Sequence, residues 1–298
     1  MGKINYAKLP TEQPNPKSKK IDRLTAAQII ALINQEDQTV PRAVGKVKRQ
    51  IARGVKLIVS ALKKGGSIFF AGAGTSGRLG VLEAAECPPT FNTRSSLVQA
   101  VMAGGKKAVF RSQEGAEDRG DEALRIFRRK LRRNDILIGI AASGVTPFVR
   151  GALQAAKEKA AGTLLVACNR TASLTHLADC LIAPKVGPEV ITGSTRLKAG
   201  TATKLILNML TVTSMIRLGK VYQNWMVDLQ PKSKKLRARA LRIIQRLGSV
   251  PPRKAEICLE DAKRNVKLAI LMAKKGWDYP TAAAKLKSSS GFLRHALS

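Results

Sequence analysis

Apolar residues recur along the chain in two patterns, short unbroken runs and longer stretches at helical spacing. The first run, Ile68-Phe69-Phe70-Ala71, leads directly into a glycine-rich segment. Short runs of this kind, separated by stretches with helical periodicity, are typical of parallel strands connected by helices. We therefore predict an α/β fold, a three-layer α/β/α sandwich around a parallel sheet. The predicted strands cover residues 68–71, 96–102, 136–141, 163–167 and 180–183.

Helical periodicity dominates both ends of the chain. Thr25 is a suitable N-cap for a first helix, and Gly65-Gly66 is expected to end a second helix that starts near Val40. A long apolar helix is expected over 194–218 and a basic amphipathic helix over 231–247. The predicted domains are an N-terminal arm with helices that pack on the core (1–66), an α/β domain (67–250) and a small helical C-terminal domain (251–298).

Composition limits the class of protein. The 298 residues are 44% hydrophobic and 4% aromatic, which supports an aliphatic core and excludes a disordered tail, a collagen and a disulfide mini-scaffold. The four cysteines have no CxxC spacing, which is consistent with reduced thiols in a cytosol. Two histidines are too few for a histidine-based metal cluster. No apolar run reaches the length that spans a bilayer, and the first residues lack the apolar stretch of a signal peptide. We therefore expect a cytoplasmic protein without membrane contact.

Two predicted strand-to-helix turns, Gly72–Gly77 and Ser143–Thr146, combine glycines with hydroxyl side chains. In an open parallel sheet, ligands bind at the carboxyl ends of the strands, where helix N-termini favour anions. The first turn lacks the lysine of a Walker A loop, and no acidic residue follows about 20 residues later as a dinucleotide site requires. The turns thus favour a bare sugar phosphate. The alternative is that the glycines only make tight connections.

Carboxylates are scarce, so their positions are informative: seven of the 20 lie between Glu83 and Glu122. Glu86 precedes Cys87-Pro88-Pro89, which we expect to end its helix and to desolvate its carboxyl group. Glu117 belongs to a second acidic cluster at 114–118. Two carboxylates in unlike environments are suited to general acid–base catalysis. In the alternative interpretation, Glu117 and Asp118 cap the following helix and Glu83 lies in solvent.

The segment Gly193–Thr201 places hydroxyls, two cations and glycines at the start of the long apolar helix. Arg196 or Lys198 is a candidate to bind an anionic group of a ligand. The alternative is a capped, buried helix start whose cations lie in solvent.

Five segments form a specific combination: AGAGTSGRLGVLEAAECPPTF (71–91), EGAED (114–118), IAASGVTPF (140–148), VGPEVITGSTRLKAGTATKLILNML (186–210) and IRLGKVYQNWMVDLQ (216–230). In this order they closely resemble the N-acetylmuramic acid 6-phosphate etherase family, and the likeness covers essentially the whole chain.

The resemblance implies that residues 67–250 form a sugar isomerase (SIS) domain. It implies a homodimer with active sites near the subunit interface, and neither a metal nor a cofactor. The implied reaction cleaves the D-lactyl ether of N-acetylmuramic acid 6-phosphate, giving N-acetylglucosamine 6-phosphate and D-lactate in the recycling of cell-wall sugars. A non-catalytic sugar-phosphate sensor on the same fold, like the glucokinase regulatory proteins, is the alternative.

Site residues follow from the family motifs. Glu86 matches the acid that protonates the departing lactate oxygen, and Glu117 matches the second carboxylate, which we expect to remove the C2 proton. The presence of both favours the enzyme over the sensor. The expected substrate-binding residues are Gly74, Thr75, Ser76, Gly77, Ser143, Gly144, Thr146, Ser194, Arg196 and Lys198, with the N–H groups of Gly77 and Gly144 assisting. The chain departs from the family pattern at Val145, where Arg is usual, and at Glu83, where Asp is usual.

The chain is strongly basic, with 53 Lys and Arg against 20 Asp and Glu and a formal charge of +33. The cations lie mostly in helical stretches, which indicates enrichment on the surface. Such a charge attracts a substrate that carries both phosphate and carboxylate. Aromatics are few and no recognition motif is present, so we expect nucleic acid to bind only adventitiously at low salt. A general bias toward Lys and Arg is a further explanation.

Overall fold

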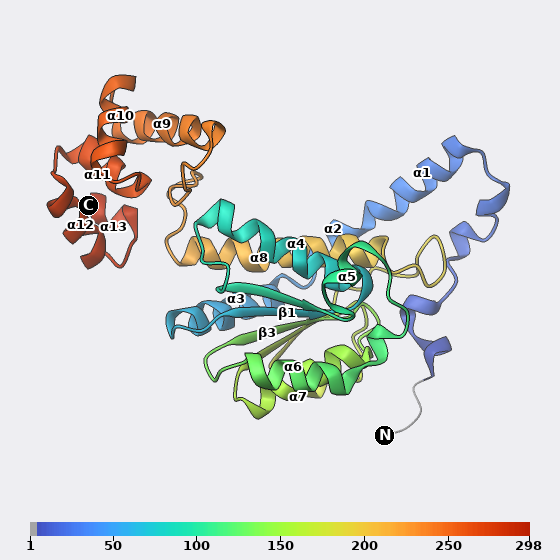
Figure 1. The fold of residues 1–298 in the computed structure, drawn as a ribbon. Helices are drawn as coiled ribbons and strands as arrows, with labels where there is room; N and C mark the ends of the chain where they lie inside the picture. The colour runs from blue at the N-terminus through green and yellow to red at the C-terminus, as the bar shows by residue number, and fades with distance from the viewer. Residues whose placement is uncertain (1–4) are drawn as a thin grey trace. The chain divides into compact units, whose positions relative to one another are not determined.

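A five-stranded, entirely parallel sheet of order β2-β1-β3-β4-β5 lies at the centre of the computed structural model (Figure 1). The model describes residues 5–298, so residues 1–4 of the predicted N-terminal arm lie outside the described residues. The strands are β1 (Ile68–Gly72), β2 (Val98–Met102), β3 (Ile136–Ile140), β4 (Gly162–Val166) and β5 (Cys180–Ile182). All five predicted strands are confirmed, with small shifts at their ends.

Helices precede, separate and follow these strands. They are α1 (Ala26–Asp37), α2 (Thr39–Gly45), α3 (Lys48–Lys63), α4 (Gly74–Phe91), α5 (Gly105–Phe110), α6 (Gly120–Lys130), α7 (Pro147–Glu158), α8 (Lys198–Arg217), α9 (Lys234–Gly248), α10 (Pro252–Asp261), α11 (Val266–Lys275), α12 (Tyr279–Ser288) and α13 (Leu293–Leu297). Short 3₁₀ turns include η5 (Ala116–Asp118) and η6 (Thr175–Leu177). Among the described helices, none is both long and apolar enough to cross a membrane.

Local sequence explains several helix boundaries. Thr25 begins α1 with a capping box that it shares with Gln28. Gly65 takes the left-handed conformation (φ +79°) that ends α3. The single helix predicted from Val40 to Lys64 is divided into α2 and α3, because Val47 departs from helical geometry with φ −107° and ψ 17°.

Helices α6 and α7 cover one face of the sheet, below it in Figure 1. Phe127 and Phe148, from these two helices, share a buried apolar cluster with Phe69 of β1 and Leu137 of β3. The packing is tight here: a Cβ added to Gly139 would lie only 2.7 Å from the Val149 side chain of α7. Helices α6 and α7 therefore pack against every second residue of the strands, since successive strand side chains point to opposite faces of the sheet.

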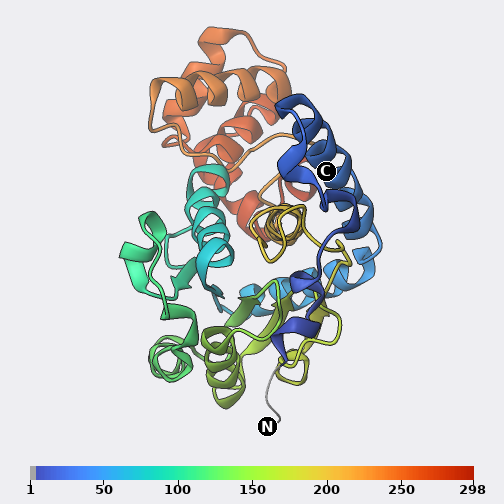
Figure 2. The same cartoon turned by 90° about the vertical axis from the view of Figure 1, so that its right-hand side faces the viewer.

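Helices α3, α4 and α8 cover the opposite face. Gly54 of α3 lies against Leu210 of α8 and Leu164 of β4, and Gly80 of α4 lies against Phe70 of β1. The strand register aligns Phe70, through β3, with Leu164, so these contacts occur on one face. The predicted three-layer α/β/α sandwich is thus confirmed, and Figure 2 shows it turned by 90°.

Contacts divide the structure into two compact units. One contains the residues up to Ala84 together with Ser95–Thr211, and the other contains Ala85–Arg94 together with Val212–Ser298. The apolar side of α9 is buried in a core that it shares with α10 and α11. Because of this shared core, α9 belongs to the helical unit, whereas the predicted domain boundary at 250/251 assigns it to the α/β domain.

Gly77→Ala is expected to destabilise the fold, because a Cβ at this position would lie 2.7 Å from the carbonyl oxygen of Gly72 and 2.7 Å from Met102. Overpacking against backbone costs about 1–3 kcal/mol in the free energy of unfolding, measured by urea denaturation. Gly45→Ala in α2 is the matched control, since no atom lies within 4 Å of its added Cβ. The control should gain about 0.5–1 kcal/mol, and equal stability of the two variants would contradict this packing argument.

Candidate functional site at the carboxyl edge of the sheet

The first candidate turn links β1 to α4. Gly74 has φ +53° and begins α4, so the free N–H groups of the first helical turn lie at the carboxyl edge of the sheet. Thr75 and Ser76 are half-buried in this turn. The N–H of Gly77 already donates to the carbonyl oxygen of Ala73 at 3.1 Å. The predicted contribution of that N–H to a ligand is therefore not supported, and Gly77 serves close packing instead.

The second candidate turn links β3 to α7. Gly144 is buried with φ +74°, and its N–H donates to the carbonyl oxygen of Ala141 at 2.9 Å. This N–H is thus also engaged within the chain, contrary to its predicted contribution to binding. Ser143 and Thr146 are half-buried, and α7 begins at Pro147, where its first turn tolerates proline.

The sheet order brings the two turns to adjacent strand ends. Gly72 at the end of β1 pairs with Ile140 at the end of β3. Helix α4 packs on one face of the sheet and α7 on the other, so the strand order reverses between β1 and β3. Such a switch point opens a crevice at the carboxyl ends of the strands, which is where ligands bind in open α/β sheets.

A cavity of about 340 Å³ adjoins the first turn. Ala73 and Gly74 line it on one side, and residues 112–117 line it on another. Arg78 of α4 fixes α5 beside this cavity by donating to the carbonyl oxygens of Ala108 and Val109, each at 2.9 Å. The fold thereby brings the exposed Glu117 and Gly74 to one cavity, although 43 residues separate them in the chain.

Glu117 lies in the short turn η5, before α6. The N-cap of α6 is Arg119, and within the described structure no side chain caps it. The alternative in which the acidic cluster caps the helix is therefore not supported. The carboxylate of Glu117 is left exposed at the cavity.

Glu83 is buried and fully paired. Its Oε2 lies 2.9 Å from Nζ of Lys204, and its Oε1 accepts a hydrogen bond from Thr211 Oγ1 at 2.5 Å. The interpretation that Glu83 lies in solvent is wrong. Its carboxylate instead joins α4 to α8.

Glu86, one turn after Glu83 on α4, is exposed. The prediction that Pro88-Pro89 ends the helix is wrong, because α4 continues to Phe91. A proline inside a helix lacks its own N–H and crowds the preceding turn, but the carbonyl of Pro88 still accepts the N–H of Asn92 at 2.9 Å. The helix ends at Asn92, which takes φ +52°. The expected desolvation of Glu86 is not found in the single chain.

The segment before α8 forms a capped helix start. Glu189 accepts the N–H groups of Lys198 and Ala199, each at 2.9 Å, and burial raises the pKa of its carboxyl group. Ser194 is half-buried and Arg196 is exposed, which leaves the guanidinium available to an anion. Lys198 is 2% exposed, so the alternative that places both cations in solvent is correct for Arg196 and wrong for Lys198.

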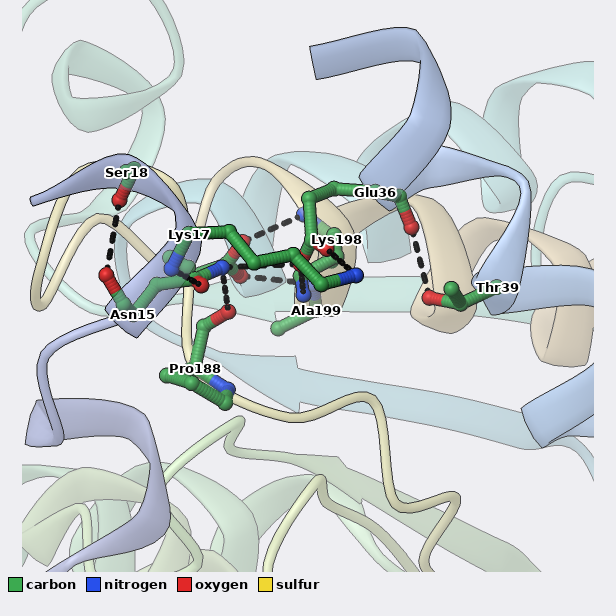
Figure 3. A network of polar contacts seen from close by, with 9 residues as sticks. Asn15, Lys17, Ser18, Glu36, Thr39, Pro188, Lys198 and Ala199 are labelled. Atoms are coloured by element: carbon green, nitrogen blue, oxygen red, sulfur yellow. Dashed lines mark hydrogen bonds and ion pairs between the residues drawn. The ribbon is translucent and has the colours of Figure 1, made fainter. Parts of the chain in front are cut away.

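Lys198 forms a buried ion pair with Glu36 of α1, at 2.6 Å between Nζ and Oε2 (Figure 3). Asn15 Nδ2 donates to the same carboxylate at 2.8 Å and Lys17 Nζ at 2.9 Å. Burial acts to raise the pKa of Glu36, but hydrogen bonds from Lys198, Lys17 and Asn15 outweigh it and lower the pKa to about 2. This cluster, Asn15, Lys17, Glu36 and Lys198, fastens the N-terminal arm and α1 to the start of α8.

The structure thus brings the residues of the two turns and Glu117 to the carboxyl edge of one sheet, while Lys198 is engaged by Glu36. Sequence reasoning missed Glu36 and Glu189. The available signal was the small number of acids in the whole chain, 20 against 53 Lys and Arg. It also missed Asn169, a buried residue just after β4. In the described part of the chain, no group of three or more His, Cys, Asp or Glu side chains is placed to hold a metal ion.

The architecture defines a protein of the sugar isomerase (SIS) fold. The family model of the glucokinase regulatory protein N-terminal SIS domain matches residues 50–157. The phosphoheptose isomerase of Neisseria gonorrhoeae has a similar fold, with a TM-score of 0.51 at 16% identity over 64% of this chain and 98% of that one. A solved protein of Escherichia coli CFT073, c3406, gives a TM-score of 0.50 at 20% identity over 67% of this chain and 96% of that one.

Similarity in sequence is closer and extends over nearly the whole chain. N-acetylmuramic acid 6-phosphate etherase 2 of Vibrio cholerae is 49% identical over 97% of this chain and 94% of its own length. The etherases of Rhizobium rhizogenes and Geobacillus thermodenitrificans are 50% and 47% identical, each over 97% of this chain and over 95% and 98% of their own lengths. The chain therefore belongs to the N-acetylmuramic acid 6-phosphate etherase family, which confirms the resemblance.

Glu36→Gln is expected to destabilise the protein in a pH-dependent way. The carboxyl group has a pKa of about 2 in the fold and 4.5 ordinarily, so its ionised form contributes about 3 kcal/mol at neutral pH. That contribution is present above pH 4.5 and is lost as pH falls toward 2. Urea denaturation of wild type and variant at pH 7 and pH 3 measures this difference, which should shrink by roughly half at pH 3.

Glu158→Gln is the control for this experiment, because Glu158 forms an exposed ion pair with Arg128. Removing an exposed pair changes the free energy of unfolding by at most about 1 kcal/mol. A loss in Glu36→Gln that is no larger than the loss in Glu158→Gln would contradict the structural role of the cluster.

Proposed function

We propose that this protein is a lyase that cleaves the D-lactyl ether of N-acetylmuramic acid 6-phosphate, giving N-acetylglucosamine 6-phosphate and D-lactate. The observation that carries this proposal is 49% identity to a named etherase over 97% of the chain. Glu86 and Glu117 are both present, and a sensor that only binds a sugar phosphate has no need of an acid–base pair. The geometry of the turns supports a phosphorylated ligand in either case.

The phosphate is held at the two turns of the switch point. Thr75 and Ser76 contribute hydroxyls at the N-terminus of α4, and Ser143 and Thr146 contribute hydroxyls before α7. Free N–H groups of the helix N-termini and their dipoles favour the anion. Ser194 and the exposed Arg196 are the remaining candidates for the sugar or its lactyl carboxylate.

The reaction begins with elimination. In the open-chain sugar, the C1 aldehyde acidifies the C2 proton, which Glu117 removes as general base. The bond between C3 and the ether oxygen breaks, and Glu86 donates a proton to that oxygen, which leaves as the hydroxyl of D-lactate. Each positioned acid or base contributes about 10²–10⁴-fold in rate.

Rehydration completes the reaction. Water adds to C3 of the unsaturated aldehyde, and C2 regains a proton, so that N-acetylglucosamine 6-phosphate is formed. The oxygen of the new C3 hydroxyl comes from solvent, and the oxygen of the lactate hydroxyl comes from the substrate. The chemistry needs only acids, bases and water, and the scheme uses neither a metal nor a cofactor.

The active form is a homodimer. Leu82 on α4 and Met209 on α8 are 41% and 43% exposed, so both offer apolar surface that a second copy can cover. Leu82 and Glu86 are four residues apart on α4 and share a helical face. A second copy that covers Leu82 therefore removes water from Glu86 as well, which favours the protonated acid that the elimination needs.

The charge of +33 concentrates a substrate that carries both phosphate and carboxylate. Nucleic acid binds only adventitiously at low salt, because such binding needs unscreened cations and no particular motif. We assign the reaction to the cytoplasm, where buried thiols such as those of Cys168, Cys180 and Cys258 remain reduced.

Purified protein is expected to release D-lactate from N-acetylmuramic acid 6-phosphate, as measured by a coupled D-lactate dehydrogenase assay. In H₂¹⁸O, mass fragmentation should locate the label in the C3 hydroxyl of the product sugar and not in lactate. Label in lactate would exclude elimination and rehydration. Binding of the sugar phosphate without any lactate release would favour the sensor.

Glu86→Gln and Glu117→Gln are each expected to lower kcat by about 10²–10⁴-fold, because glutamine cannot exchange a proton. Calorimetric binding of N-acetylglucosamine 6-phosphate should remain within about threefold of wild type. Glu122→Gln is the control, since Glu122 of α6 forms an exposed ion pair with Arg119, the N-cap of that helix. Activity of a Glu86 or Glu117 variant close to that of Glu122→Gln would remove that residue from the mechanism.

A further inference from the structure

The loop after β4 supports the turn after β3 at three points. The N–H of Cys168 donates to the carbonyl oxygen of Ala142 at 2.9 Å. Asn169 Nδ2 donates to the carbonyl oxygen of Ser143 at 3.1 Å. Gly144 approaches Ala172 so closely that a Cβ on Gly144 would lie 2.2 Å from the Ala172 Cβ. The conformation of the Ser143–Thr146 turn is therefore set largely by this neighbouring loop.

The side chain of Asn169 has only one orientation that satisfies its hydrogen bonds. It is 3% exposed, and its Oδ1 accepts both the N–H of Thr171 (3.1 Å) and the hydroxyl of Thr171 (3.0 Å). Two donors on Oδ1 oblige the NH₂ group to face Ser143. A buried amide with both ends engaged is a rigid link between the two loops.

Asn169 fixes one end of the peptide plane between Ser143 and Gly144. The carbonyl oxygen of that peptide accepts the Asn169 bond, and its N–H donates to Ala141 at 2.9 Å. With both ends held, the plane cannot rotate. The Ser143 hydroxyl, whose Oγ accepts the N–H of Val145 at 3.4 Å, therefore keeps its direction. A ligand at this turn meets donors that are already oriented, which avoids the entropy cost of ordering them.

We propose that Asn169 is the positioning residue of the phosphate-binding turn. It touches no substrate atom; it holds the Ser143–Gly144 peptide plane so that the Ser143 hydroxyl meets the phosphate in a fixed direction. The proposal rests on the proposed function in that it takes this turn as a phosphate site. It adds that affinity for the phosphate group, and not the chemical step, depends on a side chain from another strand end.

Asn169→Ala tests the proposal, because it removes the bond to Ser143 without introducing a charge beside the phosphate. We expect KM for N-acetylmuramic acid 6-phosphate to rise by about tenfold to a hundredfold, as displaced binding groups do, with kcat changed less than about threefold. Calorimetric affinity for N-acetylglucosamine 6-phosphate should weaken by the same factor as KM rises. Thr171→Val is the matched control, since it removes one donor to Oδ1 and leaves the Ser143 bond intact.

The outcomes separate the possibilities. Unchanged KM and affinity with less active protein would show a merely structural role and overturn the proposal, as would an equal loss of affinity in Thr171→Val. Thermal unfolding of Asn169→Ala and Thr171→Val shows whether a loss of affinity comes from a loss of folded protein. If wild-type protein binds the sugar phosphate but releases no lactate, the lyase proposal fails, while the calorimetric comparison still decides the role of Asn169.

Discussion

The site depends on one geometric constraint, the parallel pairing of β1 with β3 while the following helices leave to opposite faces of the sheet. The register places Gly72 beside Ile140, so both strands end at the same level. Helix α4 then packs on the Phe70 side and α7 on the Phe69 side. Only this divergence opens the carboxyl edge between the two turns. The glycines are required because α4 approaches β1 to within a distance that no Cβ at Gly77 would allow.

Carboxylates divide into buried ones that hold the fold and exposed ones that are open to solvent. Glu36, Glu83 and Glu189 are buried, and each has partners that connect α8 to another element: the arm and α1, helix α4, or the preceding loop. Burying an ionised group requires such compensation. Glu86 and Glu117 are exposed and remain accessible to a substrate. Helix α8 is thus fixed by three buried acids whose carboxylates are already engaged within the chain.

The strands and both turns could be predicted from sequence, because a short apolar run followed by glycines is a local signal. The partners of Glu83 and Lys198 could not. Lys198 meets Glu36 across 162 positions of the chain, and a helical spacing says nothing about which distant element supplies a counter-ion. The end of α4 could not be predicted from Pro88-Pro89 either. A proline removes one donor, but its carbonyl still accepts a hydrogen bond from the next turn, so the helix continues. The sequence also does not show to which unit α9 belongs, because this depends on the burial of its apolar face against α10 and α11.

The large positive charge lies mostly outside the two turns, although Arg78 lines the cavity beside the first one. The two lysines buried among the described residues, Lys198 and Lys267, are paired with Glu36 and Asp228. The turn segments 72–77 and 143–146 contain no charged side chain. In the proposed site, recognition at the turns therefore depends on hydroxyls, N–H groups and helix dipoles, which act at hydrogen-bond distance and discriminate by geometry. The surface cations act over about 10 Å at 0.1 M salt and attract any anion. Because these two contributions differ in range, salt screens the long-range attraction far more than the short-range fit, and only the second can separate a sugar phosphate from other anions.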